Sequence, residues 1–105
     1  MQISGAPTAI TNRIVTCEVS SLLGATIVPL LLSGDKKAGG LFGIHGQGAA
    51  DRVAGTVQIP PGGTVTVAML LTDDTVTSVT LVMQDPVTDA ELYRSANDIP
   101  VRLGV

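Results

Sequence analysis

The sequence predicts an all-β protein: a two-sheet antiparallel β-sandwich of about seven short strands, with at most one short helical turn. Apolar side chains recur at every second position in several stretches, Val and Thr are abundant, and helical periodicity is nearly absent. Turn residues separate the stretches, which favours a jelly-roll or immunoglobulin-like sandwich over a doubly wound fold. The length of 105 residues suits one compact domain, so residues 1–105 are expected to form a single unit.

The first strand is predicted over residues 13–20, where apolar odd-numbered positions alternate with more polar even-numbered ones, so that one face is drier than the other. Residues 25–32 are nearly all apolar, which is typical of a strand covered on both faces. Pro29 cannot donate to a neighbouring strand and therefore predicts a bulge or an unpaired edge position. Around these strands we expect a turn at 21–24, an exposed loop at 33–40, a short strand at 41–44 and a loop at 46–51.

The second half of the chain carries the strongest turn signal, Pro60-Pro61-Gly62-Gly63. Its prolines fix φ and its glycines accept the positive φ of tight turns, so the chain is predicted to reverse there. A strand over 53–59 leads into this turn. Residues 64–71 and 75–83 then alternate between apolar and Thr-containing positions and are predicted to form a hairpin whose turn contains two aspartates.

The last quarter of the chain predicts one helical turn and one strand. Residues 88–91 read Thr-Asp-Ala-Glu, which fits a capping box at the start of a helix. Residues 99–103 alternate again and predict a final strand, which Pro100 places at a sheet edge.

Composition indicates more apolar surface than a small core can hide. Charged residues make up 14% of the chain, against about 25% in an average soluble domain. With one Phe, one Tyr and no Trp, the interior must consist of aliphatic side chains. The longest apolar stretch, 25–32, is far shorter than the ~20 residues that span a bilayer, so no membrane association is expected. The N-terminal residues lack the pattern of a secretory signal, and the chain is therefore expected to remain unexported.

Charge and cysteine content exclude two further classes. The formal net charge is −3 and the six Lys and Arg residues are scattered along the chain, so nucleic-acid binding is not expected, because it needs clustered basic side chains. Cys17 is the single cysteine, which allows no internal disulfide and no thiol metal site. We expect it to be a small apolar core residue.

His45, the one histidine, lies among glycines in the segment 43–48. A catalytic reading makes it a general base with neighbouring amides as an oxyanion cradle, in a small hydrolase or metalloenzyme. No serine stands in a nucleophile-elbow context, and the glycines are followed by neither the Lys-Ser or Lys-Thr pair nor the helix of a phosphate loop. The sequence therefore predicts no enzyme, no catalytic residue and no cofactor; loss of function in His45→Ala would contradict this.

The acidic residues have two readings. Carboxylates can ligate calcium, but Asp is also favoured wherever a strand ends in a tight reversal, and the Asp-x-Asp-x-Asp-Gly spacing of calcium loops is absent. We therefore expect turn residues and no metal site. Lys36 and Lys37 are similarly expected to form a solvated loop tip. The aspartates concerned are Asp35, Asp51, Asp73, Asp74, Asp85 and Asp89.

Protein partners are expected, and five residues are candidates for contact with them. Tyr93 and Arg94 belong to types that are enriched among interface hot spots, and they follow the predicted helical turn. The other three lie in the segment 39–52, although Phe42 is also a candidate core residue. Both termini, the segment 39–52 and the segment 85–98 are expected to be contact arms that order only against neighbours. The five candidates are Phe42, His45, Arg52, Tyr93 and Arg94.

Two resemblances bear on function. The run Gly40-Leu41-Phe42-Gly43-Ile44, followed by residues 57–67 with their proline–glycine turn and alternating Thr/Val strand, resembles the middle of immunoglobulin-like sandwich domains. In size and character the cysteine-poor, aromatic-poor β domain is also similar to the small decoration, or cement, proteins of tailed bacteriophage capsids. This second resemblance implies a place in a virion that is assembled in the host cytoplasm, and a major capsid protein as partner.

The sequence thus predicts a non-enzymatic structural protein that oligomerises and docks on a larger symmetric assembly, such as a phage capsid whose shell it stabilises. The physical reason is the surplus of aliphatic side chains, because exposed apolar surface beyond a few hundred Å² usually marks an interface. The alternative is a cytoplasmic, immunoglobulin-like binding module that recognises a protein or a carbohydrate through its loops. Selective binding on a glycan array would favour this alternative.

Overall fold

The computed structural model describes residues 1–104 and shows an all-β, antiparallel sandwich; within this range ten strands and no helix are present. The predicted fold class is confirmed, and the extra strands are short ones. The strands are β1 (Gln2–Ser4), β2 (Ile14–Ser21), β3 (Ala25–Ser33), β4 (Lys36–Gly46), β5 (Ala49–Asp51), β6 (Thr56–Ile59), β7 (Gly63–Leu71), β8 (Ser78–Gln84), β9 (Glu91–Arg94) and β10 (Ile99–Pro100).

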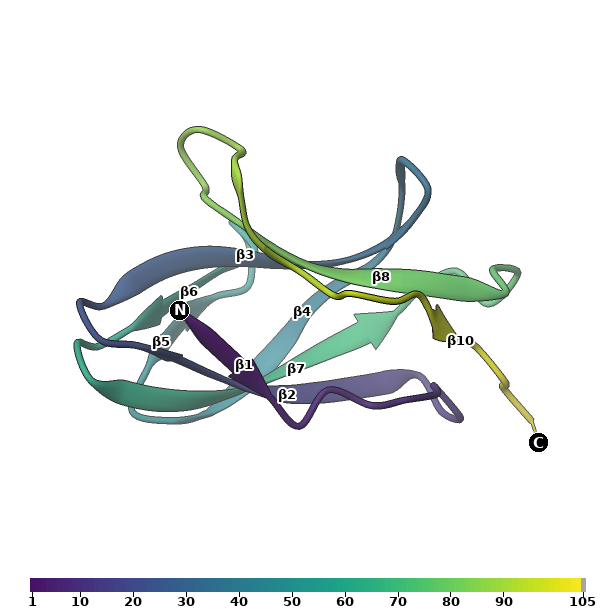
Figure 1. Cartoon of the computed structure of the whole chain (residues 1–105), viewed down its shortest axis with the longest axis horizontal. Helices are drawn as coiled ribbons and strands as arrows, with labels where there is room; N and C mark the ends of the chain where they lie inside the picture. Colours follow the sequence, from purple (N-terminus) through teal and green to yellow (C-terminus); the bar gives the residue numbers. More distant parts are fainter. Residues whose placement is uncertain (105) are drawn as a thin grey trace.

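The strands form two layers that are joined by pairing between β3 and β4 (Figure 1). One layer contains β1, β2, β7 and β4 in that order, and the other contains β3 and β8 with β9 and β10 along the free edge of β8. β6 and β5 extend from the first half of β3. The molecule is elongated, 38 × 26 × 25 Å, and the strands run roughly along its long axis.

The core lies between the layers and follows the alternation read from the sequence. β2 and β7 pair in register from Ile14↔Leu70 to Ser21↔Gly63, so their apolar alternate residues face the same side. Opposite them lie the inward residues of β3 and β8. Because no aromatic ring is fully buried, aliphatic side chains, two methionines and Cys17 fill this space. The largest fully buried side chains are Ile27, Leu31, Met69, Leu71, Leu81, Met83, Val15, Val19, Val57, Val65, Val67 and Val79.

β3 is the strand with the most neighbours, since it pairs with β4, β6 and β8. Pro29 lies opposite Met83 of β8, but neither β4 nor β6 pairs with it, which is the one-sided position that its missing N–H requires. The second face of β3 is half-buried rather than covered. In β8, by contrast, residues 79–83 are all buried, on both faces.

The predicted hairpin between residues 64–71 and 75–83 is wrong. β7 pairs with β2 and β4, whereas β8 pairs with β3, so the connection 72–77 crosses from one layer to the other. The amides of Thr72 and Asp73 donate to the carbonyl of Ala38, at 2.8 and 3.1 Å, which directs the chain across the edge. Alternation alone cannot separate these topologies, because both consist of two amphipathic strands and a short polar link.

The predicted loop at 33–40 is a tight turn, and the short strand at 41–44 is part of the eleven-residue β4. Ser33 pairs with Lys36, leaving Gly34 and Asp35 as a two-residue hairpin turn with positive φ at Gly34. Gly39 and Gly40, which were expected in the loop, are residues of β4. Gly39 is required because a Cβ there would meet the Leu70 carbonyl oxygen and the Leu31 side chain. The signal that indicated a loop therefore marks a close approach of two strands.

Two further boundaries differ from the prediction. The loop expected at 46–51 contains β5, which pairs with β6, and the strand expected at 53–59 begins at Thr56 because residues 52–55 turn. The segments 39–52 and 85–98, expected to be arms, are largely strands and turns of the sandwich itself.

The helical turn predicted at 88–91 is absent. Thr88 Oγ1 accepts a hydrogen bond from the Ala90 amide at 3.3 Å, and Glu91 begins β9, where it pairs with Arg94 instead of capping a helix. Residues 85–90 form a hairpin loop between β8 and β9. The final strand is shorter than predicted: β10 pairs with β8 at the sheet edge, and Val101 then bridges to Ile10.

Candidate functional site

The five candidate contact residues fall into two groups. Phe42 and His45 lie on β4 and Arg52 lies in the turn after β5, whereas Tyr93 and Arg94 lie on β9 at the edge of the other layer. Tyr93 and Arg94 were candidates because of their residue types and the other three because of the segment 39–52, and the structure gives each group a different environment.

Phe42 and Arg52 contact each other although ten positions separate them. A bulge between Leu41 and Gly43 turns Leu41 and Ile44 toward the core, so the Phe42 ring points outward and is 44% exposed. The prediction that Phe42 is a core residue is therefore wrong. The Arg52 guanidinium lies over the ring, 5.4 Å from the centroid, which is a cation–π arrangement. The pair forms an exposed, amphipathic spot on the outer face of β4.

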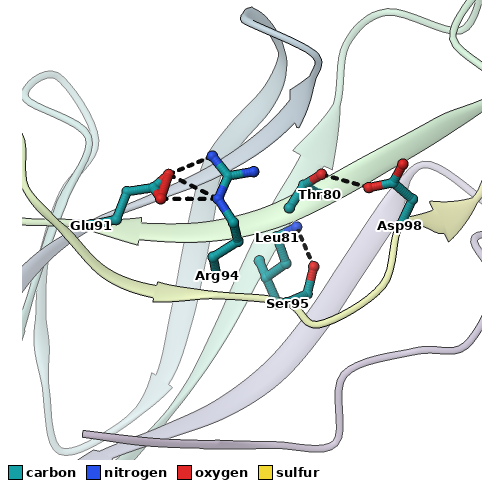
Figure 2. Close-up of polar contacts among 6 residues, drawn as sticks. All are labelled: Thr80, Leu81, Glu91, Arg94, Ser95 and Asp98. Carbon is teal, nitrogen blue, oxygen red and sulfur yellow. Dashed lines mark hydrogen bonds and ion pairs between the residues drawn. The ribbon is translucent and has the colours of Figure 1, made fainter.

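The β9 group is tied to β8 (Figure 2). Tyr93 is half-buried against the core, whereas Arg94 is exposed and its Nε donates to both carboxylate oxygens of Glu91, at 2.9 and 3.1 Å. This ion pair lowers the pKa of Glu91. Beyond β9, the Leu81 amide donates to Ser95 Oγ. These contacts fix the edge strand rather than leave it free to order against a partner.

Thr80 and Asp98 add a polar contact on the same edge. Thr80 Oγ1 donates to Asp98 Oδ1 at 2.8 Å, which satisfies the one polar side chain that is buried in the described chain (Figure 2). The contact holds the segment between β9 and β10 against β8.

His45 lies at the exposed end of β4, in register with Thr66 of β7. Among residues 1–104, no three His, Cys, Asp or Glu side chains are grouped closely enough to hold a metal ion. Asp51, Asp73 and Asp85 instead accept backbone amides two residues on, the turn role expected of them. The amides of Val87 and Thr88 hold the pKa of Asp85 below its ordinary value.

Two basic residues, Lys36 and Arg13, form ion pairs with the aspartates after β7. Lys36 directly follows the two-residue turn, and its side chain is 69% exposed, so the prediction that it is solvated is confirmed. It also has a partner, because its Nζ lies 2.6 Å from Asp73 Oδ2. Arg13 lies 2.8 Å from Asp74 Oδ2. Cys17 is buried as predicted, and burial raises the pKa of its thiol to about 11. Its thiol is thus protonated and inaccessible at neutral pH.

The most exposed large apolar residues, which the sequence reasoning missed, lie at turn tips. Leu22 and Leu23 connect β2 to β3 and are 84% and 87% exposed; Val53 and Val87, in two hairpin loops, are 101% and 88% exposed. Turn positions normally carry Gly, Pro, Asn, Asp or Ser, so local structure does not explain these side chains. The sequence signal was present, because each residue stands inside an otherwise typical turn.

The turns that carry Val53 and Val87 have the same construction. In each, an aspartate Oδ1 accepts the amides two and three residues on: 3.0 and 3.1 Å from Asp51, 2.8 and 3.0 Å from Asp85. In each, the amide four residues on donates to the aspartate carbonyl, and its residue has positive φ, 73° at Gly55 and 60° at Asp89. The third residue is the exposed valine. We call these two the twin turns, residues 51–55 and 85–89.

The remaining exposed leucines belong to an end of the molecule without ionisable side chains, which we call the charge-free end. It consists of the turns 21–24 and 60–63, at the far left of Figure 1, of the strand ends beside them, and of Met1 and Gln2, which line a depression with Leu22 and Gly62. The name refers to side chains, because the N-terminal amine of Met1 is the one ionisable group that the described residues place there. The amides of Gly24 and Gly62 both donate to the Ser21 carbonyl, at 3.3 and 2.8 Å, so the turns are tied together. A shallow depression of about 360 Å³, lined by Met1, Gln2, Ser20, Ser21, Leu22 and Gly62, adjoins the exposed Leu23.

Comparison with known proteins returns no match among family models, curated proteins or solved structures. Within residues 1–104, no helix has the length and apolar character needed to cross a membrane. The interpretation of the surface therefore rests on its own geometry and chemistry.

Proposed function

We propose that the protein is a non-enzymatic structural protein that self-associates and docks on a larger symmetric assembly, a bacteriophage capsid that it decorates and stabilises. The observation that supports this most is the set of four aliphatic side chains, Leu22, Leu23, Val53 and Val87, that project from turns. In water each of these side chains exposes apolar surface, and no contact within the chain compensates for this exposure. Burial in an interface would stabilise the assembly by about 1.5–3 kcal/mol per side chain.

The twin turns support a repetitive partner. A single chain that presents the same turn twice, each with an exposed valine, suits equivalent pockets on neighbouring copies of one shell protein. Two linked contacts also bind more tightly than either alone, because the second contact forms at high effective concentration. A capsid, in which one subunit repeats around symmetry axes, provides such pairs of sites.

Two measurements test this proposal. Light scattering on the purified protein should give a mass above that of one chain, rising with concentration. The gene for a major capsid protein should lie beside the gene for this chain, and shells assembled from that capsid protein should co-sediment with the chain.

The double variant Val53→Ser/Val87→Ser should lose co-sedimentation by about 10-fold or more, because both apolar anchors are removed. The matched control is Thr26→Ser, an exposed change outside the turns. A chain that stays monomeric at high concentration and binds no such shell contradicts the proposal.

A further inference from the structure

We propose that the charge-free end is the self-association surface and that its occupant is a second copy of this chain in a twofold, end-to-end contact. This inference rests on the self-association in the proposed function and names where that contact forms. Three features of the end bear on it: its charge, its shape and its size.

Charge does not oppose a second copy at this end. Two chains of net charge −3 repel each other, and juxtaposed like charges in an interface cost several kcal/mol. The outward row nearest the end that contains ionisable side chains is His45, Thr66 and Glu18, across β4, β7 and β2. Beyond that row the paired outward residues are Thr64, Ser20 and Gln2. Two copies meeting here bring no ionised side chain against another, and the one ionisable group that residues 1–104 bring to the contact is the N-terminal amine of Met1.

Shape supplies self-complementarity. A twofold interface places one patch against itself, so the patch must contain both a projection and a hollow. Leu23 projects from the turn 21–24, and the depression lined partly by Met1 and Leu22 lies beside it. In a twofold contact, Leu23 of each copy enters the depression of the other. The hydrogen bonds from Gly24 and Gly62 to Ser21 hold projection and hollow in fixed relation.

Size limits the contact to a small dimer. The end face lies across the long axis of the molecule and extends at most 26 × 25 Å, the width of the whole molecule. This upper limit is below the roughly 800 Å² per partner that a standard interface buries, so the contact belongs to the class of small, weak interfaces. The contact is therefore a modest dimer whose affinity depends on the central leucines, as interface energy usually depends on a few well-buried residues.

Sedimentation velocity of the full chain over a range of concentrations tests this proposal. The wild type is expected to dimerise, and Leu22→Ser/Leu23→Ser is expected to raise the dimer dissociation constant about 100-fold or more, since it removes four apolar side chains per dimer. The matched control is Val53→Ser/Val87→Ser, which removes equally exposed side chains away from this end and should leave dimerisation unchanged. Because all four side chains are exposed, each double variant should keep the thermal unfolding of the monomer.

Cross-linking locates the contact directly. A mixture of Leu23→Cys and Gln2→Cys, whose residue 2 lines the depression, should form an intermolecular disulfide under mild oxidation, whereas a mixture of Val87→Cys and Gln2→Cys should not. The thiol of Cys17 is buried and should not react. Raising NaCl should not weaken the dimer, because no ion pair forms it and salt screens the repulsion between the two chains.

The outcomes separate the two proposals. If Leu22→Ser/Leu23→Ser still dimerises like the wild type, or if Val53→Ser/Val87→Ser no longer dimerises, the charge-free end is not the self-association surface. Self-association itself then still holds. A wild type that is monomeric at all concentrations overturns this surface and the self-association in the proposed function, whereas docking on a shell is tested separately by co-sedimentation. A monomer that co-sediments with uncharged phosphatidylcholine vesicles through Leu22 and Leu23 overturns the surface in favour of a lipid contact.

Discussion

The two ends of the sandwich meet their surroundings in opposite ways. At the charge-free end, two turns tied through Ser21 present Leu22 and Leu23. At the other end, which we call the charged end, the turn 33–36 and the connection 72–77 are held by the ion pairs Lys36–Asp73 and Arg13–Asp74 (Figure 1). Both ends close strands of similar length, so chain reversal does not explain the difference.

The difference shows what each end is suited to face. The charged end carries side chains that water solvates well, and its aspartates also serve its own turns. The charge-free end gains no local stabilisation from its leucines, since they contact little of their own chain. An end with this character is suited to meet another apolar surface, as proposed above.

The largest expected effects come from glycines that both ends require. A Cβ on Gly48, beside the charge-free end, would lie 2.6 Å from the Gln58 carbonyl oxygen and 2.8 Å from Val65 Cγ2; one on Gly39, toward the charged end, would meet the Leu70 carbonyl oxygen. Gly48→Ala and Gly39→Ala should each lower the free energy of unfolding by about 3 kcal/mol, because the backbone of the neighbouring strand must move to make room for the added methyl group. Urea denaturation measures this.

Gly43 on the same strand as Gly39 is the matched control. It has no atom within 4 Å of a Cβ, so Gly43→Ala should change stability by less than about 0.5 kcal/mol. If only one of the Gly39 and Gly48 variants is destabilised, the close approach is confined to that end and the ends differ in packing as well as in charge.

Smaller effects should distinguish the turns at the two ends. Gly24 and Gly34 both have positive φ, but a Cβ on Gly24 would lie 3.1 Å from the Ile59 carbonyl oxygen and 3.2 Å from the Pro61 ring, whereas Gly34 has open space. Gly34→Ala and Gly24→Ala should cost about 1 and 2 kcal/mol, respectively. Thermal unfolding gives the ranking.

Asparagine tests the cause of that ranking. Gly34 is the first of two turn residues and the only one of them with positive φ, a position that favours Gly over Asn, so Gly34→Asn should recover only part of the stability lost in Gly34→Ala. Gly24→Asn should recover little, because crowding against the turn 60–63 remains. Equal recovery at both positions would mean that the turns of the charge-free end are not packed against each other.

The sequence was informative where one physical rule decided the outcome. Alternation in residues 13–20 and 64–71 predicted the buried faces of β2 and β7, and the proline–glycine run predicted the turn 60–63. It was misleading where two rules share a signal. Gly39 reads as a loop residue but permits close strand approach, and an alternating pair reads as a hairpin whether or not the connection crosses between layers.

The candidate surface was harder to predict than the fold. The contact between Phe42 and Arg52 depends on a bulge in β4, which no residue in the sequence specifies. The exposed leucines and valines could have been found, because each stands at a turn position that favours polar residues. Their grouping into a charge-free end depends on strand pairing that brings residues 21–24 and 60–63 together, and pairing between distant strands cannot be read from local pattern.

The smallest expected effect is in acid, and it should affect the charged end alone. The ion pair with Lys36, followed by hydrogen bonds from Thr75, holds the pKa of Asp73 well below its ordinary value, and Arg13 lowers the pKa of Asp74. A lowered folded-state pKa stabilises the fold above the unfolded pKa of about 3.9, and this stabilisation is lost as the pH falls toward the folded-state value. Stability should therefore decline below about pH 4.

Asp73→Asn should be less stable than the wild type near neutral pH, and the difference should shrink as the pH falls below about 4, because the wild type then loses the same charge. Lys36→Gln should act in the same direction, since it removes the partner that keeps Asp73 ionised. Both effects are small because the pair is accessible to water and salt. Urea denaturation at several pH values measures them.

No side chain of the charge-free end titrates in this range, so Leu22→Ser/Leu23→Ser should leave the acid dependence of unfolding unchanged. A changed dependence would show that the two ends are coupled through the sheets.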